Sequence, residues 1–381
     1  MSNTNNWHLF CRVVDNFGDI GVCWRLAKQL VQQHQKQVTL WVDDLQSFNS
    51  ICPDVNTQQD AQIVQGVAVR HWQNPFTGAE LLAQAEVVIE AFACDLPEVV
   101  LNRLQAQAKQ PVWLNLEYLS AEDWVEGMHG LPSPVHGMTK YFYFPGFTCN
   151  TGGLLWQTEL LELPSIMQSE QQQQQLLSEL DVTADLAAKD CLISLFAYEN
   201  TEVQSLLTAL SQAQQNITLL VPQGRVSDDV STWFGKKITM GKENVKGSLT
   251  IIGLPFMSQP QYDRVLAACD ISFVRGEESV VRAQMLGLPM IWHIYEQEDE
   301  AHLVKLNAFL NRYLEDAPTN LKEELQQAFL GWNIPNTHSV DWLHLLNCLP
   351  QWRLHAKKWQ QQQKSHGDLT TNLVKYVENT L

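Results

Sequence analysis

The chain has 381 residues, of which 45% are hydrophobic, and a formal net charge of −17 that results from 25 basic and 42 acidic side chains. This length exceeds what one compact core usually serves, so we expect two domains. The excess of negative charge argues against binding of a nucleic acid through bulk electrostatics, although it does not exclude a local basic patch.

The chain shows no sequence signal of export, membrane insertion or metal binding. Its first six residues are polar, and no apolar run approaches the length that spans a bilayer. The 8 cysteines form no Cys-x-x-Cys pair and fall mostly within apolar segments, and the 11 histidines form no metal-spaced cluster. We therefore expect a cytoplasmic protein with buried thiols, no disulfide framework, no membrane contact and no metal.

Two carboxylates lie at a bend near the N-terminus. Residues 9–14 form an apolar run typical of a buried strand, and apolar residues then recur every fourth position from residue 22 to residue 30, as on one face of a helix. Ligands of open α/β sheets bind at such strand-to-helix bends. Because Gly18 and Gly21 have no Cβ, they allow a sharp turn and a close substrate. The bend reads Asp15, Asn16, Phe17, Gly18, Asp19, Ile20, Gly21 and Val22.

The first half of the chain alternates strand-like runs with helical patterns. Further runs cover residues 38–42, 85–90 and 111–116, and alternation of this kind predicts parallel βαβ units. A glutamine-rich stretch at residues 169–180 then fits either a disordered linker or a solvated helix. We place the domain boundary just after it, between residues 184 and 185.

A second alternating series predicts a second doubly wound domain. Its runs cover residues 191–196, 217–221, 249–252, 271–274 and 289–292. The tail at 352–381 is helical and polar with a few apolar positions, and it could cross back over the first domain. The sequence thus predicts an α/β protein with a Rossmann-like domain at 1–184, a second at 185–355 and a C-terminal helix at 356–381.

Aromatic and amide side chains follow two strands of the second series. Phe196 and Tyr198 lie at the end of its first strand, and Phe256 and Gln259 follow its third. A ring at the carboxyl end of a strand can stack on a nucleobase, and an amide can recognise its polar edge. Each ring taken singly is more often part of a core, but the position that these residues share favours a binding site.

A glycine turn at Gly276 opens directly into a helix after the fourth strand of this series. A helix N-terminus presents unpaired N–H groups and the positive end of the helix dipole, so it can bind a phosphate, with Arg275 and Ser279 adding directed donors. Glu277 and Glu278 would repel a diphosphate unless at least one reaches past it to sugar hydroxyls, as a nucleotide sugar would allow. The spacing is equally compatible with acidic residues that only stabilise the helix start.

Five longer motifs lie at residues 15–22, 91–98, 113–122, 275–284 and 291–295. Together they resemble the protein-arginine rhamnosyltransferases that modify bacterial elongation factor P, the EarP family. The resemblance spans nearly the whole chain. It implies a GT-B fold, with two Rossmann-like domains facing across a cleft and a C-terminal helix that crosses back to the first. It also implies an inverting, metal-independent transfer of L-rhamnose from dTDP-β-L-rhamnose to an arginine of elongation factor P.

The resemblance assigns the donor to the second domain and the acceptor to the first. For the donor it implies Phe196 and Tyr198 near the base and sugar, Phe256 and Gln259 at the thymine, Arg275, Gly276 and Ser279 at the diphosphate, and Glu277 at the ribose. Glu278 stands where the family pattern has aspartate. In the first domain the expected substrate contacts are the bend residues Asn16, Phe17, Gly18 and Gly21. Independently of the resemblance, Glu117 and Tyr118 follow a strand and could form a further part of the acceptor surface.

Asp19 is our candidate for the base, and we expect it to face the substrate together with Asp15. The reference pKa of aspartate lies roughly 9 units below that of arginine, so complete deprotonation before attack would cost about 12 kcal/mol. We therefore expect proton transfer that is late or concerted with attack, while Asp15 holds the guanidinium. The helix dipole and Arg275 would stabilise the departing diphosphate without a metal.

Three alternatives remain open at this stage. Asp15 and Asp19 could instead cap the helix that follows them. The chain could be a GT-B glycosyltransferase with a small-molecule acceptor, or a nucleotide-sugar-binding protein without catalysis. Two carboxylates in the acceptor domain favour an enzyme, because a pure binder has no need of them.

Overall fold

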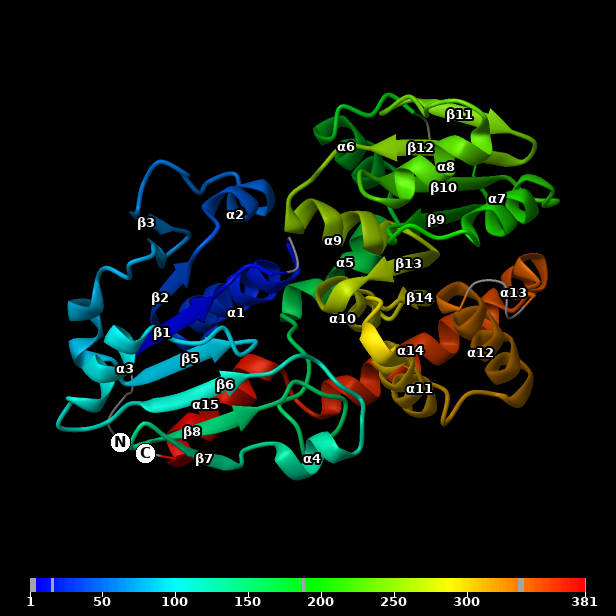
Figure 1. The fold of residues 1–381 in the computed structure, drawn as a ribbon. Helices are drawn as coiled ribbons and strands as arrows, with labels where there is room; N and C mark the ends of the chain where they lie inside the picture. The colour runs from blue at the N-terminus through cyan, green and yellow to red at the C-terminus, as the bar shows by residue number, and fades with distance from the viewer. Residues whose placement is uncertain (1–4, 15–16, 185, 187–188, 335–338, 381) are drawn as a thin grey trace. The chain divides into compact units, whose positions relative to one another are not determined.

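The computed structural model describes residues 5–14, 17–184, 186, 189–334 and 339–380. Contacts divide the chain into two compact units, unit 1 with residues 1–157 and 365–381 and unit 2 with residues 158–364. Each unit is built around its own sheet of mostly parallel strands (Figure 1). The predicted α/β class with two sheets is therefore confirmed.

Unit 1 contains an eight-stranded sheet in the order β3-β4-β2-β1-β5-β6-β8-β7. Among the described strands of this sheet, only β3 and β7 run antiparallel to their neighbours. Parallel strands share one carboxyl edge, so the segments that follow β1, β5 and β6 lie together. The described elements are β1 (Asn6–Cys11), α1 (Gly18–His34), β2 (Gln37–Val42), α2 (Leu45–Ile51), β3 (Ala61–Val64), β4 (Val67–His71), η1 (Ala79–Gln84), β5 (Val87–Ala91), α3 (Glu98–Gln105), β6 (Val112–Leu116), α4 (Trp124–Met128), β7 (Pro132–Val135), β8 (Met138–Tyr143) and α15 (Leu369–Thr380).

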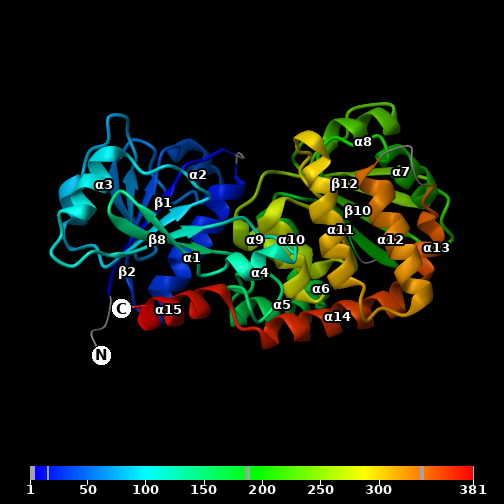
Figure 2. The same cartoon turned by 60° about the horizontal axis from the view of Figure 1, so that its bottom comes forward.

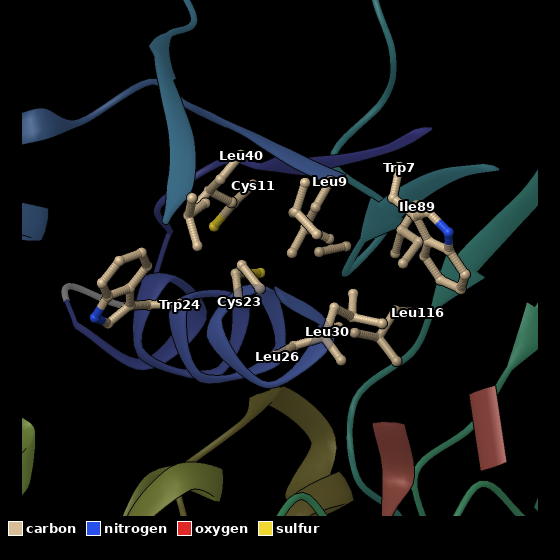
Figure 3. Close-up of a cluster of buried hydrophobic side chains, with 14 of the residues drawn as sticks. Trp7, Leu9, Cys11, Cys23, Trp24, Leu26, Leu30, Leu40, Ile89 and Leu116 are labelled. Carbon is tan, nitrogen blue, oxygen red and sulfur yellow. The ribbon is translucent and has the colours of Figure 1, made fainter. Parts of the chain in front are cut away.

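The core of unit 1 follows from the alternation of side chains along β1. Trp7, Leu9 and Cys11 belong to the cluster that packs against α1, whereas Phe10 points to the opposite face and belongs to a second cluster. Both faces of the strand are buried, which explains its continuous apolar run. On the α1 side the strand residues meet Cys23, Trp24, Leu26 and Leu30 of the helix (Figure 3).

β1 ends three residues earlier than the predicted strand at 9–14. The backbone N–H groups of Val13 and Val14 donate to the carboxylates of Asp43 and Asp19, both at 2.9 Å, instead of to a neighbouring strand. Val14 is accordingly 78% exposed. The segment can leave the sheet because carboxylate side chains, instead of a neighbouring strand, accept its backbone N–H groups. Hydrophobic periodicity does not report such contacts, so the prediction made the strand too long.

The C-terminal helix α15 completes unit 1. Leu369, Leu373, Val374 and Val377 are buried in the same cluster as α1, and α15 lies beside α1 (Figure 2). The predicted crossing of the tail to the first domain is therefore present, but it begins near residue 365 rather than at 356.

The preceding helix, α14 (Leu349–Ser365), stays with unit 2 because its tryptophans are anchored there. Trp352 donates from Nε1 to the hydroxyl of Tyr313 at 3.2 Å, and Trp359 donates to Gln284 at 2.7 Å. The two tail helices are separated at Gly367, whose φ of +83° lies in the left-handed region that favours glycine.

Unit 2 contains a six-stranded sheet in the order β11-β12-β10-β9-β13-β14, and of the strands described there only β11 is antiparallel to its neighbour. All five strands predicted for this half are present. The described elements are α5 (Thr158–Met167), α6 (Glu170–Glu179), β9 (Cys191–Leu195), α7 (Val203–Ser211), β10 (Ile217–Pro222), α8 (Val226–Phe234), β11 (Glu243–Lys246), β12 (Leu249–Leu254), α9 (Gln259–Ala268), β13 (Ile271–Arg275), α10 (Gly276–Leu286), β14 (Met290–His293), η2 (Glu298–Glu300), α11 (Ala301–Tyr313), α12 (Thr319–Asn333), α13 (Trp342–Asn347) and α14.

The first boundary between the units lies after residue 157, earlier than the predicted position after residue 184. The glutamine-rich stretch forms α6, as the helical interpretation predicted, and α6 packs against α9 of unit 2. Leu176 and Leu177 are buried, and Glu179 pairs with Arg264 at 2.5 Å. These contacts, rather than composition, attach the segment to the second unit.

Candidate functional site

In unit 1 the candidate site lies at the carboxyl edge of the sheet, where β1, β5 and β6 are neighbours. Asp19 lies in the first turn of α1, close after β1. Its Oδ2 accepts the N–H of Val14 at 2.9 Å, and its Oδ1 accepts the hydroxyl of Tyr118 at 3.2 Å. The residue is only 2% exposed. The structure thus buries a carboxylate that we expected to face the substrate, and holds it by hydrogen bonds from its own unit.

The other residues of the predicted bend lie in or before the first turns of α1, or outside the described residues. Asp15 and Asn16 lie outside the described residues. Phe17 is the N-cap residue of α1, and Gly18 and Gly21 belong to its first turns, where the N–H of Gly21 donates to the carbonyl of Phe17 at 2.9 Å. The two glycines therefore continue a helix, and the sharp turn that we expected at them is not observed.

An aromatic pair adjoins Asp19. Tyr118 follows β6, Phe92 follows β5, and their rings stack with centroids 4.4 Å apart and planes 17° apart. Tyr118 remains 39% exposed. The Tyr118 ring and the buried Asp19 carboxylate are in direct contact at the edge of the sheet, since the Tyr118 hydroxyl donates to Asp19. The sequence pointed to Tyr118 as part of the acceptor surface, but no periodicity signalled Phe92.

Two buried polar side chains hold the loop that carries Phe92. Phe92, Ala93 and Asp95 all have positive φ, between 51° and 57°, a conformation that non-glycine residues rarely adopt. Glu90 accepts the N–H of Asp95 at 3.1 Å, and Asn115 accepts the N–H of Ala93 at 3.2 Å. Strained backbone of this kind clusters at functional sites.

A pocket of about 440 Å³ opens on the same unit. Arg12 lies over the Trp72 ring at 5.1 Å, and Asp43 and Asp95 supply carboxylates. The lining residues are Arg12, Asp43, Trp72, Gln73, Asn74, Phe76, Asp95 and Pro97. None of them was predicted as a site residue, because they come from four separate loops.

In unit 2 a cation rests on two aromatic rings at the carboxyl edge of the sheet. The Arg275 guanidinium lies 4.5 Å from the ring centroid of Phe196 and 4.8 Å from that of Tyr198. β9 and β13 are neighbours, which brings the residues that follow β9 to the end of β13. The Nε of Arg275 is buried and has no hydrogen-bond partner among the described residues. The predicted set of Arg275, Phe196 and Tyr198 is thus brought together around a donor that a ligand can satisfy.

Helix α10 begins directly at this cation. Gly276 has a φ of +64°, and a Cβ added there would lie 3.9 Å from the Tyr198 hydroxyl. The Ser279 hydroxyl accepts the N–H of Arg275 at 3.1 Å and donates to its carbonyl. Ser279 therefore fixes the turn into the helix. Its hydroxyl bonds to the backbone of Arg275, whereas we expected it to be directed at a phosphate.

The remaining donor-side residues surround the same helix start. Gln259, at the beginning of α9, is buried and donates from Nε2 to Glu278 at 3.3 Å. Glu277 and Glu278 lie in the first turn of α10. Phe256 is 42% exposed, and its N–H donates to Gln223 at 3.3 Å. The structure thus joins Gln259 to Glu278 and keeps Phe256 partly exposed just after the end of β12.

The last residue of β14, a residue that follows this strand and the N-cap residue of α8 complete this edge. His293 and Tyr295 both meet the Tyr198 ring edge-on, at 5.3 and 5.5 Å. Burial, with the charge of Arg275, lowers the pKa of His293 to about 4, so its ring is neutral near pH 7. Arg225 lies 6.0 Å from the Tyr198 ring and pairs with Glu199 at 3.6 Å. Sequence reasoning missed Arg225, which no motif flagged.

Among the residues that the structure describes, no group of three or more His, Cys, Asp or Glu side chains is arranged to hold a metal ion. No helix there has the length and apolarity to cross a bilayer. All eight cysteines are free, and all but Cys149 and Cys348 are buried, in agreement with the predicted thiols.

Comparison with solved structures defines the class of protein. The kitacinnamycin glycotransferase matches with a TM-score of 0.52 over 98% of this chain and 99% of that one, at 11% identity, a level that shows the fold alone. The two mostly parallel sheets and this match therefore define a glycosyltransferase fold of the GT-B type, as predicted.

Sequence comparison identifies the family. The sequence model of the family "elongation factor P (EF-P) rhamnosyltransferase EarP" matches residues 7–378. The chain therefore belongs to this family. A protein-arginine rhamnosyltransferase of Pseudomonas putida is 46% identical over 98% of this chain and 99% of its own length. A structure described as the basis for EarP-mediated arginine glycosylation of translation elongation factor EF-P has 34% identity, a TM-score of 0.67 and 99% coverage of both chains. The resemblance stated from the motifs is confirmed.

Proposed function

We propose that this protein transfers L-rhamnose from dTDP-β-L-rhamnose to an arginine side chain of elongation factor P, with inversion at the anomeric carbon. The match of the family model over residues 7–378 carries this proposal. The relatives' name, protein-arginine rhamnosyltransferase, supports the protein acceptor and neither of the two alternative functions. Because the acceptor is a translation factor, we assign the reaction to the cytoplasm.

Unit 2 supplies the groups that a nucleotide sugar needs. A diphosphate at the start of α10 would meet its N-terminal N–H groups and the Arg275 guanidinium, whose Nε lacks a partner among the described residues. The exposed Phe256 ring suits stacking on the thymine, and Gln259 lies close to it in sequence for the polar edge. Glu277 in the first turn of α10 is our candidate for the ribose hydroxyls.

Charge that develops on the departing dTDP is the main electrostatic demand of the reaction. The dipole of α10 and the fixed charge of Arg275 meet that demand without reorganisation. We therefore propose a metal-independent reaction, in which these groups take the part that a divalent cation has elsewhere.

On the acceptor side, Asp19 is the proposed base. A guanidinium nitrogen attacks the anomeric carbon, the new C–N bond forms as the bond to the diphosphate oxygen breaks, and the nitrogen's proton passes to Asp19. Because the reference pKa of an aspartate side chain lies far below that of a guanidinium, this transfer is late, when bond formation has made the nitrogen acidic. Asp15 is proposed to hold the guanidinium, although it lies outside the described residues.

The proposal is tested by incubating the protein with EF-P and dTDP-rhamnose in excess EDTA and measuring the intact mass of EF-P. We expect the addition of one deoxyhexose, located on an arginine by fragmentation. An unmodified mass with and without added divalent cations would refute the acceptor or the donor, and activity that returns only with added cations would refute the metal-independent mechanism.

Asp19→Asn tests the base. We expect kcat to fall by about 10²- to 10⁴-fold, because general-base catalysis contributes a factor of this size. The affinity for dTDP, measured by calorimetry, should stay unchanged because the donor groups belong to unit 2. Asp44→Asn is the matched control, since Asp44 caps α2 through the N–H groups of Gln46 and Ser47. Normal turnover of the Asp19 variant would remove Asp19 from this role.

A further inference from the structure

The stacked pair of Phe92 and Tyr118 has the geometry of a platform for a planar cation. One face of the Tyr118 ring is covered by Phe92 at a centroid distance of 4.4 Å, while the residue as a whole stays 39% exposed. Its hydroxyl donates to the buried carboxylate of Asp19 at 3.2 Å. An exposed ring and a carboxylate in direct contact are the two groups that a guanidinium recognises, through its flat face and its N–H edge.

Backbone hydrogen bonds of the surrounding loops hold this pair in place. The N–H of Phe92 donates to the carbonyl of Leu116 at 2.7 Å, which ties the loop after β5 to the end of β6, two residues before Tyr118. Phe92 itself has a φ of 57°, and the buried Glu90 and Asn115 hold the residues that follow it. The loop thus keeps a strained backbone conformation at Phe92, the residue whose ring stacks on Tyr118.

We propose that Tyr118, supported by Phe92, is the acceptor-binding residue on which the arginine guanidinium stacks while its N–H groups approach Asp19. This inference rests on the proposed function and adds to it the residue that selects arginine. A planar guanidinium can stack and donate at the same time, whereas the compact ammonium of lysine cannot cover the ring in the same way. The stack also fixes the plane of the attacking nitrogen before the sugar is transferred.

A double-mutant cycle tests the stacking. The dissociation constant for EF-P is measured by calorimetry, in the presence of dTDP, for the wild-type protein and Tyr118→Leu, each with native EF-P and with an EF-P variant whose acceptor arginine is alanine. Loss of a cation–π contact should weaken binding of native EF-P by about 3- to 30-fold in Tyr118→Leu. Binding of the alanine variant should change by less than about twofold, because the partner of the ring is already absent.

Matched variants separate the ring from the hydroxyl and from the fold. Tyr118→Phe keeps the ring and should bind native EF-P with an affinity near that of the wild type, while its kcat falls because Asp19 loses one donor. Tyr118→Met fills the space against Phe92 and replaces the leucine variant if the latter is unstable. Trp124→Leu is the control for an exposed aromatic residue, since Trp124 is 53% exposed and lies edge-on to Phe144 at 5.5 Å.

Three results would overturn the inference: unchanged affinity of Tyr118→Leu for native EF-P, equal weakening for native and alanine EF-P, or equal weakening by Tyr118→Phe and Tyr118→Leu. All three presuppose that the wild-type protein glycosylates EF-P. Absence of that activity would instead refute the proposed function.

Discussion

Asp19 and Arg275 show two different ways of holding a charged side chain at the edge of a sheet. Both oxygens of Asp19 accept hydrogen bonds from its own unit, so its position is set by the protein. Arg275 rests on two rings and keeps a buried Nε without a partner among the described residues. Because an unsatisfied buried donor costs free energy, we expect Arg275 to contribute mainly to ligand binding.

Arg275→Met should weaken the binding of dTDP by about 10- to 100-fold, because hydrogen bonds to charged groups contribute about 1.5–3 kcal/mol. The same variant should raise the pKa of His293, since the charge of Arg275 lowers it. Calorimetry measures the first effect and the NMR titration of His293 the second.

Lys322→Met is the control for Arg275→Met, because it removes one positive charge from an exposed position on α12 of the same unit. Equal dTDP affinities of the two variants would contradict a specific contact of Arg275 with the diphosphate.

At the scale of elements, the helix α15 determines where unit 1 ends. Its apolar stripe is buried against the core that α1 and β1 form, although more than 200 residues separate it from the rest of the unit. Gly367 allows the chain to turn between α14 and α15 with a positive φ. The tail is therefore part of the first unit's core rather than an appendage of the second.

Leu373→Ala should lower the free energy of unfolding of unit 1 by about 2–5 kcal/mol, because it leaves a cavity at a position that is 1% exposed. Urea titration measures this loss. Lys375→Ala, at an exposed position of the same helix, should change stability by less than about 0.5 kcal/mol. Affinity for dTDP should be retained in both variants, and its loss in Leu373→Ala would contradict the assignment of α15 to unit 1.

At the scale of the whole molecule, buried histidines make stability depend on pH. Burial lowers the pKa of His8 to about 4, and burial with neighbouring charge lowers that of His293 to about 4. His8 lies in β1 and its Nδ1 accepts the Nε1–H of Trp41 at 3.1 Å, which requires a neutral ring nitrogen. Both rings are therefore neutral in the folded protein at pH values where the unfolded chain is already protonated.

Stability should therefore fall as the pH decreases from about 6.5 to about 4, because in this interval the unfolded chain binds more protons. Each of the two histidines contributes a loss of about 3 kcal/mol over the interval. His8→Gln, whose amide oxygen can still accept from Trp41, should show a smaller decrease. Urea titrations at several pH values measure the difference, and an identical pH dependence of the two proteins would contradict this role of His8.

Part of the candidate site was predictable from sequence because it consists of motifs next to strands. Arg275 ends β13, and Phe196 and Tyr198 follow β9. The apolar runs located both strands within one or two residues, and the strand order then brings the three side chains together. Phe92 and Arg225 were not predictable, because their positions depend on loop conformation and on ring contacts between distant segments. The short hairpins β3–β4 and β7–β8 were missed as well, since their strands are brief and partly polar.

The α/β class, the central parallel strands and the family were predictable from the order of the residues, because buried strands need apolar runs and the family's motifs are contiguous. Only contacts made in the folded chain show that residues 158–184 belong to unit 2, that α15 returns to unit 1 and that Asp19 is buried and accepts the Tyr118 hydroxyl. The physical reason is the same in each case: these features depend on contacts between segments far apart in the chain, whereas periodicity and motifs report only what neighbouring residues do.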